Sequence, residues 1–501
     1  MTNSAKLLAL ALLGLAAAAQ PLAAQDASVK HATSAFTPGE TATPNPLPSA
    51  VTTSHELKFA DRTLKFTAKA GAIRLSDANN GTPVADIAYV AFLKDGEDPA
   101  NRPITFAFNG GPGAGSAWLD LGALGPWRLP LDAGALAPSA SPRTVDNAET
   151  WLDFTDLVFI DAPETGYSRT LNKDAAKSFQ NVGGDINALA VVIRKWLVEN
   201  HRIASPKFIA GESYGGFRAP KLARRLVDNE GIGVNGIIMI SPVLDFGWFE
   251  STNNPLTFAT HLPSFTAAAR NITHLEGRGK LADVEAYAAG PYIVDLLRGE
   301  ADAAALARIS EKVAVFTGLD PALVRKLGGR IDTATFERER DRAQGRVASA
   351  YDATVTGFDP HPHAARSRYS DPVLDALKAP LASAMADIAA NKLNWFIDAR
   401  YEILNESVSE NWDWGHGNAE ALDDLKEDLA LDPHFRVLVA HGATDLVTPY
   451  FTSKLLLDQI PPMGEPNRVR LVVYGGGHML YARDKSRAAL RDDARKLIEG
   501  K

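Results

Sequence analysis

Ser213 lies in a pattern that is typical of a serine built for nucleophilic attack. Residues 211–215 read Gly-Glu-Ser-Tyr-Gly, and a short apolar run ending at Ala210 precedes them. A serine at the tip of a sharp strand-to-helix turn has little room around its backbone. The residues two before and two after it must therefore be nearly free of side chain. The plainer alternative is a solvated serine in a glycine-rich turn.

A serine hydroxyl is a weak nucleophile without a base, and two later residues have the types and positions to activate it. Asp445 follows the apolar run 435–440, and His478 follows the run 469–474 and three glycines. The chain order serine, acid, histidine, each beyond a strand end, is that of α/β-hydrolases. We therefore expect Ser213, Asp445 and His478 to form a catalytic triad. Taken singly, the aspartate could cap a turn and the histidine could lie on a surface turn, but their joint order argues against coincidence.

Negative charge that develops on a substrate oxygen needs hydrogen-bond donors already in place. The N–H of Tyr214, directly after the nucleophile, is one expected donor. The other should come from an early loop, and Asn-Gly-Gly-Pro-Gly at 109–113 directly follows the apolar run 104–108. We choose the Gly111 N–H as the second donor of this oxyanion hole. A plain Gly/Pro turn is the alternative for this loop.

The apolar runs that precede these loops predict the fold. From position 55 onward apolar residues alternate with polar ones, which indicates antiparallel strands. Short apolar runs then alternate with segments of helical spacing, such as 186–197, which indicates a parallel sheet covered on both faces. Together with the chain order of Ser213, Asp445 and His478, this pattern predicts an α/β-hydrolase fold with a mostly parallel central sheet.

The chain divides into five segments by composition. A positive residue and a short apolar run at 1–24 are typical of a secretory signal peptide, and 25–50 has the composition of a disordered leader. We assign 51–250 and 400–501 to the hydrolase core. The Ala-rich segment 251–399 loses the strand signal, so we expect it to be an inserted, mainly helical cap.

Composition limits the classes of binding partner and the cellular compartment that we expect for this protein. The formal net charge is −8, with no long basic run, which argues against nucleic acid or an anionic membrane surface as a partner. No run after the signal segment is long enough to span a membrane. The 501 residues include no cysteine, so no disulfide forms. With the signal segment, this predicts a periplasmic or secreted protein.

Several motifs together resemble the serine carboxypeptidase family. They are Asn-Gly-Gly-Pro-Gly at 109–113, Gly-Glu-Ser-Tyr-Gly-Gly at 211–216, Gly-x-x-Asp-x-x-x-Pro at 442–449 and Gly-Gly-His-Met at 476–479. The segment 161–168 is also similar to a family motif. The resemblance covers the hydrolase core and extends to neither the leader nor the cap.

The resemblance implies a particular activity. Members of that family remove C-terminal residues from peptides and grip the free carboxylate with an asparagine and a glutamate, which correspond to Asn109 and Glu212 here. Like charges push the pKa of such a glutamate upward, so carboxylate binding should be best at acidic pH. The alternative for Glu212 is a residue that only fills space in the turn before Ser213 and has no role in binding.

Three positions depart from the family pattern. Ala123 stands where the family usually carries a second glutamate, which leaves the expected paired-acid grip incomplete. Ala114 stands where a cysteine often follows the first motif. Arg218 replaces a usual aromatic residue and either supplies compensating charge or, as we prefer, forms a salt bridge.

We therefore expect a secreted serine hydrolase that releases C-terminal residues from peptides, without metal or cofactor and without stable membrane insertion. An esterase or acyltransferase with the same triad is the alternative that Ala123 favours. A non-catalytic binding module on the same scaffold is a second alternative, against which the complete triad argues. The sequence predicts neither oligomeric state nor side-chain preference.

Overall fold

The computed structural model describes residues 46–249, 253–365, 368–415 and 419–501. The expected signal peptide at 1–24 lies outside the described residues, and so does the expected leader up to residue 45. Among the described residues, no helix combines the length and the apolar character that crossing a lipid bilayer requires.

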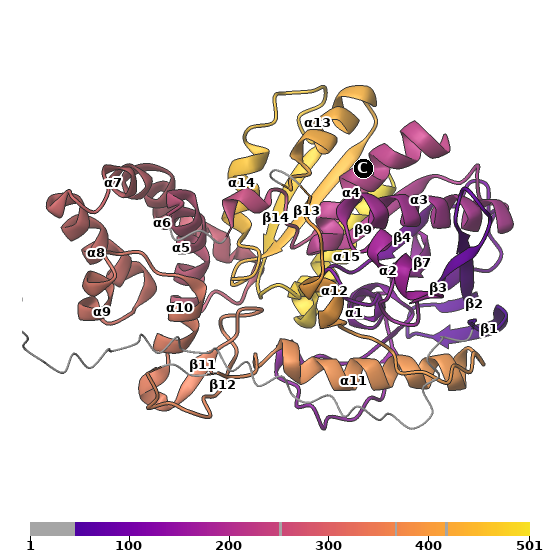
Figure 1. Ribbon diagram of the computed structural model, residues 1–501, viewed down its shortest axis with the longest axis horizontal. Helices are drawn as coiled ribbons and strands as arrows, with labels where there is room; N and C mark the ends of the chain where they lie inside the picture. The colour runs from indigo at the N-terminus through magenta and orange to yellow at the C-terminus, as the bar shows by residue number, and fades with distance from the viewer. Residues whose placement is uncertain (1–45, 250–252, 366–367, 416–418) are drawn as a thin grey trace, which may run out of the picture. The chain divides into compact units, whose positions relative to one another are not determined.

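One sheet of ten strands forms the centre of the described chain (Figure 1). Its order is β1-β2-β3-β7-β4-β9-β10-β13-β14, with β8 paired to β3. The bounds of its strands are β1 Val51–Lys58, β2 Thr63–Ser76, β3 Pro83–Lys94, β4 Ile104–Phe108, β7 Asp156–Ile160, β8 Arg169–Thr170, β9 Lys207–Glu212, β10 Gly236–Ile240, β13 Arg436–Gly442 and β14 Val469–Tyr474.

The strands that lead to the site are parallel and buried. β4, β7, β9, β10, β13 and β14 pair in parallel, whereas β1, β2 and β3 pair antiparallel with their neighbours. Every residue of β4 and β10 is buried, as expected for strands covered on both faces. The predicted α/β-hydrolase fold with a mostly parallel sheet is therefore confirmed.

Helices cover the two faces of the sheet. On one face α3 (Val182–Glu199), α4 (Tyr214–Arg225) and α13 (Leu422–Leu431) contribute to a core with alternate strand residues. On the other face α1 (Ala117–Leu119), α11 (Leu374–Asp387) and α15 (Asp484–Ile498) do so. Parallel strands bring their carboxyl ends to one edge of the sheet, so the loops after β4, β9, β13 and β14 meet there.

The long segment between β10 and β13 packs in two groups. Its first helices share a core with α14 (Tyr450–Leu457), and Figure 1 draws them as one cluster. They are α5 Pro255–Ala269, α6 Ala282–Tyr287, α7 Ile293–Arg298, α8 Ala303–Thr317, α9 Pro321–Lys326 and α10 Thr333–Glu339. Its later part, around α11, packs on the sheet instead. The proposed cap boundaries at 251 and 399 stay a prediction.

The remaining short elements connect these layers. Strands β11 (Arg346–Ala348) and β12 (Thr356–Phe358) form a hairpin, and β5 (Trp127–Arg128) pairs with β6 (Val145–Asp146). Helix α2 spans Lys173–Phe179 and α12 spans Glu406–Glu410. The loop between β11 and β12 reaches the candidate site.

Candidate active site

Ser213 forms the turn between β9 and α4. Its backbone has φ 60° and ψ −122°, a conformation that few residues other than glycine adopt and that clusters at functional sites. Its N–H donates to the Ile240 carbonyl at 2.9 Å, which ties the turn to β10. The turn thus holds the serine where β9 ends.

The glycines around Ser213 are required by crowding. A Cβ at position 211 would lie 2.0 Å from the Gly215 carbonyl oxygen, and a Cβ at 215 would lie 2.8 Å from the Phe108 carbonyl oxygen. Both distances are shorter than van der Waals contact, so a side chain at either position would force the turn apart. This is the crowding that the G-x-S-x-G spacing predicts.

Asp445 and His478 lie side by side beyond β13 and β14. Asp445 Oδ2 lies 2.9 Å from His478 Nδ1, and the Asp445 side chain is fully buried. The N–H groups of Val447 and Thr448 donate to Asp445 Oδ1 at 2.8 and 3.0 Å. The Thr448 hydroxyl lies 2.7 Å from Oδ2. The carboxylate is therefore fixed by donors and faces the imidazole.

His478 is held by main-chain contacts on both sides. Its N–H donates to the Tyr351 carbonyl at 2.6 Å, and its carbonyl accepts from the Ser241 hydroxyl at 2.8 Å. Burial lowers the pKa of His478, but the charge and hydrogen bond of Asp445, with Glu212, outweigh burial and raise it overall. Asp445 therefore stabilises the imidazolium that forms when His478 takes a proton.

Ser213 and His478 face one cavity of about 110 Å³, whose wall also includes Asn109, Gly111 and Glu212. Across the described residues, the structure records no hydrogen bond between Ser213 Oγ and the His478 ring. Such contacts are often long without substrate. The structure thus brings the predicted nucleophile and base to the same space.

The loop with one expected oxyanion donor, Gly111, lies against the residue that carries the other, Tyr214. A Cβ on Gly110 would lie 2.5 Å from the Tyr214 nitrogen, so the loop after β4 lies directly against the start of α4. Tyr214 is the first residue of that helix, where the helix leaves an N–H unused. Gly111 has φ +99°, and no hydrogen bond from its N–H is recorded within the described ranges.

Glu212 is buried in the wall of the cavity and bonded to two neutral donors. Asn109 Nδ2 and the Tyr481 hydroxyl each lie 2.8 Å from Glu212 Oε2. Burial raises the pKa of Glu212 to about 7, against lowering by the positive charge of His478 and by the two hydrogen bonds. Asn109 and Glu212 thus lie together, with Glu212 protonated in mildly acidic solution.

Arg218, one of the three departures, forms a buried salt bridge. Its Nε donates to Asp185 at 2.8 Å, and both side chains are 1% exposed. Its Nη1 donates to the Asn109 carbonyl at 2.7 Å, and its guanidinium lies 5.0 Å from the centre of the Tyr214 ring. The salt-bridge interpretation of Arg218 is therefore confirmed, and the pair holds the loop after β4.

Three residues that contact the site were not singled out from the sequence. Thr448 contacts Asp445, Tyr481 contacts Glu212, and the Tyr351 ring lies edge-on to the His478 ring with centroids 5.3 Å apart. Thr448 and Tyr481 lie only three residues beyond Asp445 and His478, a proximity that could have drawn attention to them. No sequence signal links Tyr351, which comes from the long insertion, to the site.

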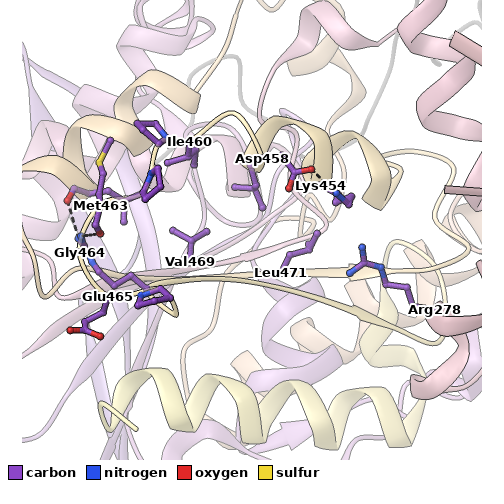
Figure 2. Close-up of a pocket in the computed structure, with 15 residues that line it drawn as sticks. Arg278, Lys454, Asp458, Ile460, Met463, Gly464, Glu465, Val469 and Leu471 are labelled. Carbon is purple, nitrogen blue, oxygen red and sulfur yellow. Dashed lines mark hydrogen bonds and ion pairs between the residues drawn. The ribbon is translucent and has the colours of Figure 1, made fainter. Parts of the chain in front are cut away.

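A larger cavity of about 530 Å³ lies elsewhere, beside β14 (Figure 2). None of Ser213, Asp445 and His478 lines it. Its lysine, Lys454, pairs with Asp458 at 2.5 Å. Although a larger cavity is the usual first candidate, we assign the chemistry to the smaller one because the nucleophile and base face it.

Comparison with protein families places the match in the first half of the core. The family described as serine carboxypeptidase matches residues 62–255. This range contains Asn109, Glu212 and Ser213 but ends before Asp445 and His478. The resemblance to the serine carboxypeptidase family is confirmed over that range.

Curated relatives agree. A pheromone-processing carboxypeptidase of Schizosaccharomyces japonicus is 27% identical over 194 residues, which are 38% of this chain and 33% of that protein. A serine carboxypeptidase-like protein of Arabidopsis thaliana is 26% identical over 181 residues, 34% of this chain and 39% of that protein. The matched segments thus span only 33% and 39% of the length of these relatives.

A solved structure extends the likeness in fold to most of the chain. A prohormone-processing carboxypeptidase from Saccharomyces cerevisiae superposes with a TM-score of 0.55, covering 86% of this chain and 90% of that one at 14% identity. At this identity the match establishes the α/β-hydrolase fold alone.

Proposed function

We propose that the protein is a serine-type carboxypeptidase that releases C-terminal residues from peptides. The observation that carries the proposal is the single cavity that Ser213, His478, Asn109 and Glu212 all line. A nucleophile with its base and a carboxylate-binding pair in the same small space suits a substrate cut next to its C-terminus.

In the proposed reaction Ser213 Oγ attacks the carbonyl carbon of the last peptide bond while His478 Nε2 takes its proton. Asp445 keeps the other ring nitrogen protonated and stabilises the imidazolium. The N–H groups of Gly111 and Tyr214 bind the oxyanion. His478 then protonates the leaving amine, and water hydrolyses the acyl-enzyme by the same steps.

The substrate's terminal carboxylate would bind at Asn109 and Glu212. A carboxylate repels an ionised glutamate but accepts a hydrogen bond from a protonated one. The pKa of about 7 keeps Glu212 protonated at acidic pH. Peptides with a free C-terminus are therefore the proposed substrates, and the helices between β10 and β13 are proposed as the cap that shapes the neighbouring pocket.

The direct test follows release of the C-terminal residue from a free-acid peptide by mass spectrometry. We expect the wild type to shorten the peptide from its C-terminus and Ser213→Ala to leave it intact. A Ser213→Ala variant with the full wild-type rate would exclude Ser213 as the nucleophile. Because a signal peptide is predicted, we also propose that the protein is exported. N-terminal sequencing of the mature protein tests this by locating the cleavage site.

Two alternative functions can be distinguished from the proposed one by experiment. The esterase or acyltransferase alternative rests on Ala123, and a C-terminal amide discriminates it, because an esterase should process free-acid and amide substrates alike. The binding-module alternative predicts no reaction of Ser213 with an organophosphorus probe, whereas a mass increase on Ser213 supports catalysis.

A further inference from the structure

A tyrosine from another part of the chain packs against the turn that carries Ala123. Ala123 is 1% exposed and lies in η1 (Asp120–Leu124). A Cβ at the preceding Gly122 would lie 2.5 Å from Cε2 of Tyr481. The Tyr481 ring, itself fully buried, therefore packs directly against the turn where the family pattern would supply a second acid.

The Tyr481 hydroxyl must donate its hydrogen to Glu212. Glu212 Oε2, at 2.8 Å, is the one hydrogen-bond partner recorded for this hydroxyl within the described residues. A buried hydroxyl hydrogen without an acceptor is costly, so the hydrogen points to Oε2.

Asn109 fixes the same oxygen from the other side. Its Oδ1 accepts from the Leu119 N–H at 3.1 Å, which orients the amide and leaves Nδ2 to donate to Glu212 Oε2 at 2.8 Å. Glu212 Oε2 therefore accepts two hydrogen bonds. The proton of a neutral Glu212 is left for Oε1, which has no recorded hydrogen bond to a described residue, while Glu212 lines the cavity.

We propose that Tyr481 replaces the missing acid at position 123 as the partner of Glu212, and that it positions Glu212 so that Oε1 presents a proton to the substrate's terminal carboxylate. This inference rests on the proposed carboxypeptidase function. Tyr481 acts through Glu212 and is a positioning residue. The carboxylate grip then contains one titrating acid instead of two.

The groups that face Glu212 are consistent with a single titration step. His478 and Asp445 act on it through their charges, and Tyr481 and Tyr351 face it as phenols. Burial raises the pKa of both tyrosines, so neither ionises near neutral pH. Dividing the rate on a free-acid peptide by that on its amide cancels the shared effect of His478 on catalysis.

The test compares Tyr481→Phe with the wild type on a free-acid peptide and its C-terminal amide. We expect the free-acid preference at pH 5 to fall roughly tenfold through KM, while kcat on the amide stays within about twofold, because one hydrogen bond to Glu212 is lost. The midpoint of the preference against pH should also move upward, because the lost donor stabilised the Glu212 anion.

Tyr450→Phe is the matched control. Tyr450 is fully buried and donates to Glu285 at the same 2.8 Å, but neither residue lines the cavity. Its loss should leave both the preference and its midpoint unchanged. An equal effect of both substitutions would overturn the inference, since it would reflect a general loss of packing.

The wild type alone supplies a second readout that does not depend on folding of the variant. The free-acid preference is the rate on the free-acid peptide divided by the rate on its amide. Its logarithm should fall by one for each pH unit above the Glu212 pKa. A fall near two per pH unit would reveal a second titrating acid and overturn the inference. If the wild type prefers free acids and Tyr481→Phe keeps the full preference, only the positioning role of Tyr481 is contradicted. A wild type without any preference contradicts the carboxypeptidase proposal and this inference with it.

Discussion

Two buried carboxyl groups, Asp445 and Glu212, lie in the same site but in opposite surroundings. Asp445 accepts hydrogen bonds on both oxygens, from two main-chain N–H groups and from Thr448, and it faces His478. Glu212 accepts two bonds on one oxygen, both from neutral side chains, and it borders the cavity.

The difference teaches how surroundings give one kind of group two tasks. Donors on both oxygens and a neighbouring imidazole hold Asp445 in a position that suits it to orient His478. Deep burial raises the pKa of Glu212 to about 7 although its two hydrogen bonds lower it, which suits Glu212 to hold a proton for an anionic ligand. In the proposed mechanism Asp445 stabilises the charge on the imidazolium, and a neutral Glu212 binds the substrate's carboxylate.

Asp445→Asn should give the largest effect and test the first half of this comparison. The N–H groups of Val447 and Thr448 would retain the amide oxygen, so the amide NH₂ would face His478 Nδ1 and impose the wrong tautomer. We expect kcat to fall about 10⁴-fold with little change in KM. Steady-state kinetics on a free-acid peptide provide the measurement.

Asp428→Asn is the control for this substitution. Asp428 is also buried, but it lies on α13 and does not line the cavity. Its kcat should match the wild type. A fall of less than tenfold for Asp445→Asn would contradict the orienting role.

Glu212→Gln should separate the second carboxyl from the first. Glutamine can accept from Asn109 and Tyr481 on its oxygen and direct its NH₂ toward the cavity, as a protonated glutamate does. The wild-type preference for free acids should fall as pH rises through about 7 and be about 100-fold lower at pH 9 than at pH 5, whereas the variant's should be flat. The same fall in both proteins would mean that another group titrates.

The same pair of proteins should differ in the pH dependence of stability. The folded-state pKa of Glu212 is raised from 4.5 to about 7, so the folded state holds the proton more tightly than the unfolded state. Its contribution is fully present below pH 4.5 and is lost as pH rises through about 7.

Between pH 5 and pH 8 the wild type should therefore lose about 2.5 kcal/mol of unfolding free energy more than Glu212→Gln does. Urea denaturation at both pH values measures this difference. Parallel curves for the two proteins would show that Glu212 ionises alike in both states.

Thr448→Val should have the smallest effect. It removes the hydroxyl 2.7 Å from Asp445 Oδ2 and 3.1 Å from His478 Nδ1, and we expect kcat to fall roughly tenfold, as for loss of one hydrogen bond to a charged group. Thr452→Val is matched, because Thr452 is 1% exposed and its hydroxyl has no recorded partner within the described chain. Equal rates for the two variants would remove Thr448 from the orienting network.

Much of this site can be predicted from the sequence motifs and from the order of the strands. The G-x-S-x-G spacing and the apolar runs before each loop predict a parallel sheet whose strand ends bring Ser213, Asp445 and His478 together. That works because the carboxyl ends of parallel strands lie at one edge, whatever the distance between them in the chain.

The partners of these residues could not be predicted in the same way. Tyr481 reaches Glu212, and Tyr351 reaches His478, only through packing between segments that share no local pattern. The Asp185 partner of Arg218 likewise comes from a different helix, α3. Periodicity reports which face a residue presents, whereas such pairings depend on how whole elements dock.

The most direct measurement of the central proposal is the rate at which the wild type removes the last residue from a free-acid peptide and from its C-terminal amide at pH 5. A serine carboxypeptidase that binds the terminal carboxylate at Asn109 and Glu212 should process the free acid at least about tenfold faster, since the amide loses a hydrogen bond made to a charged group. Equal rates on the two peptides would contradict carboxylate recognition and favour an esterase-like hydrolase.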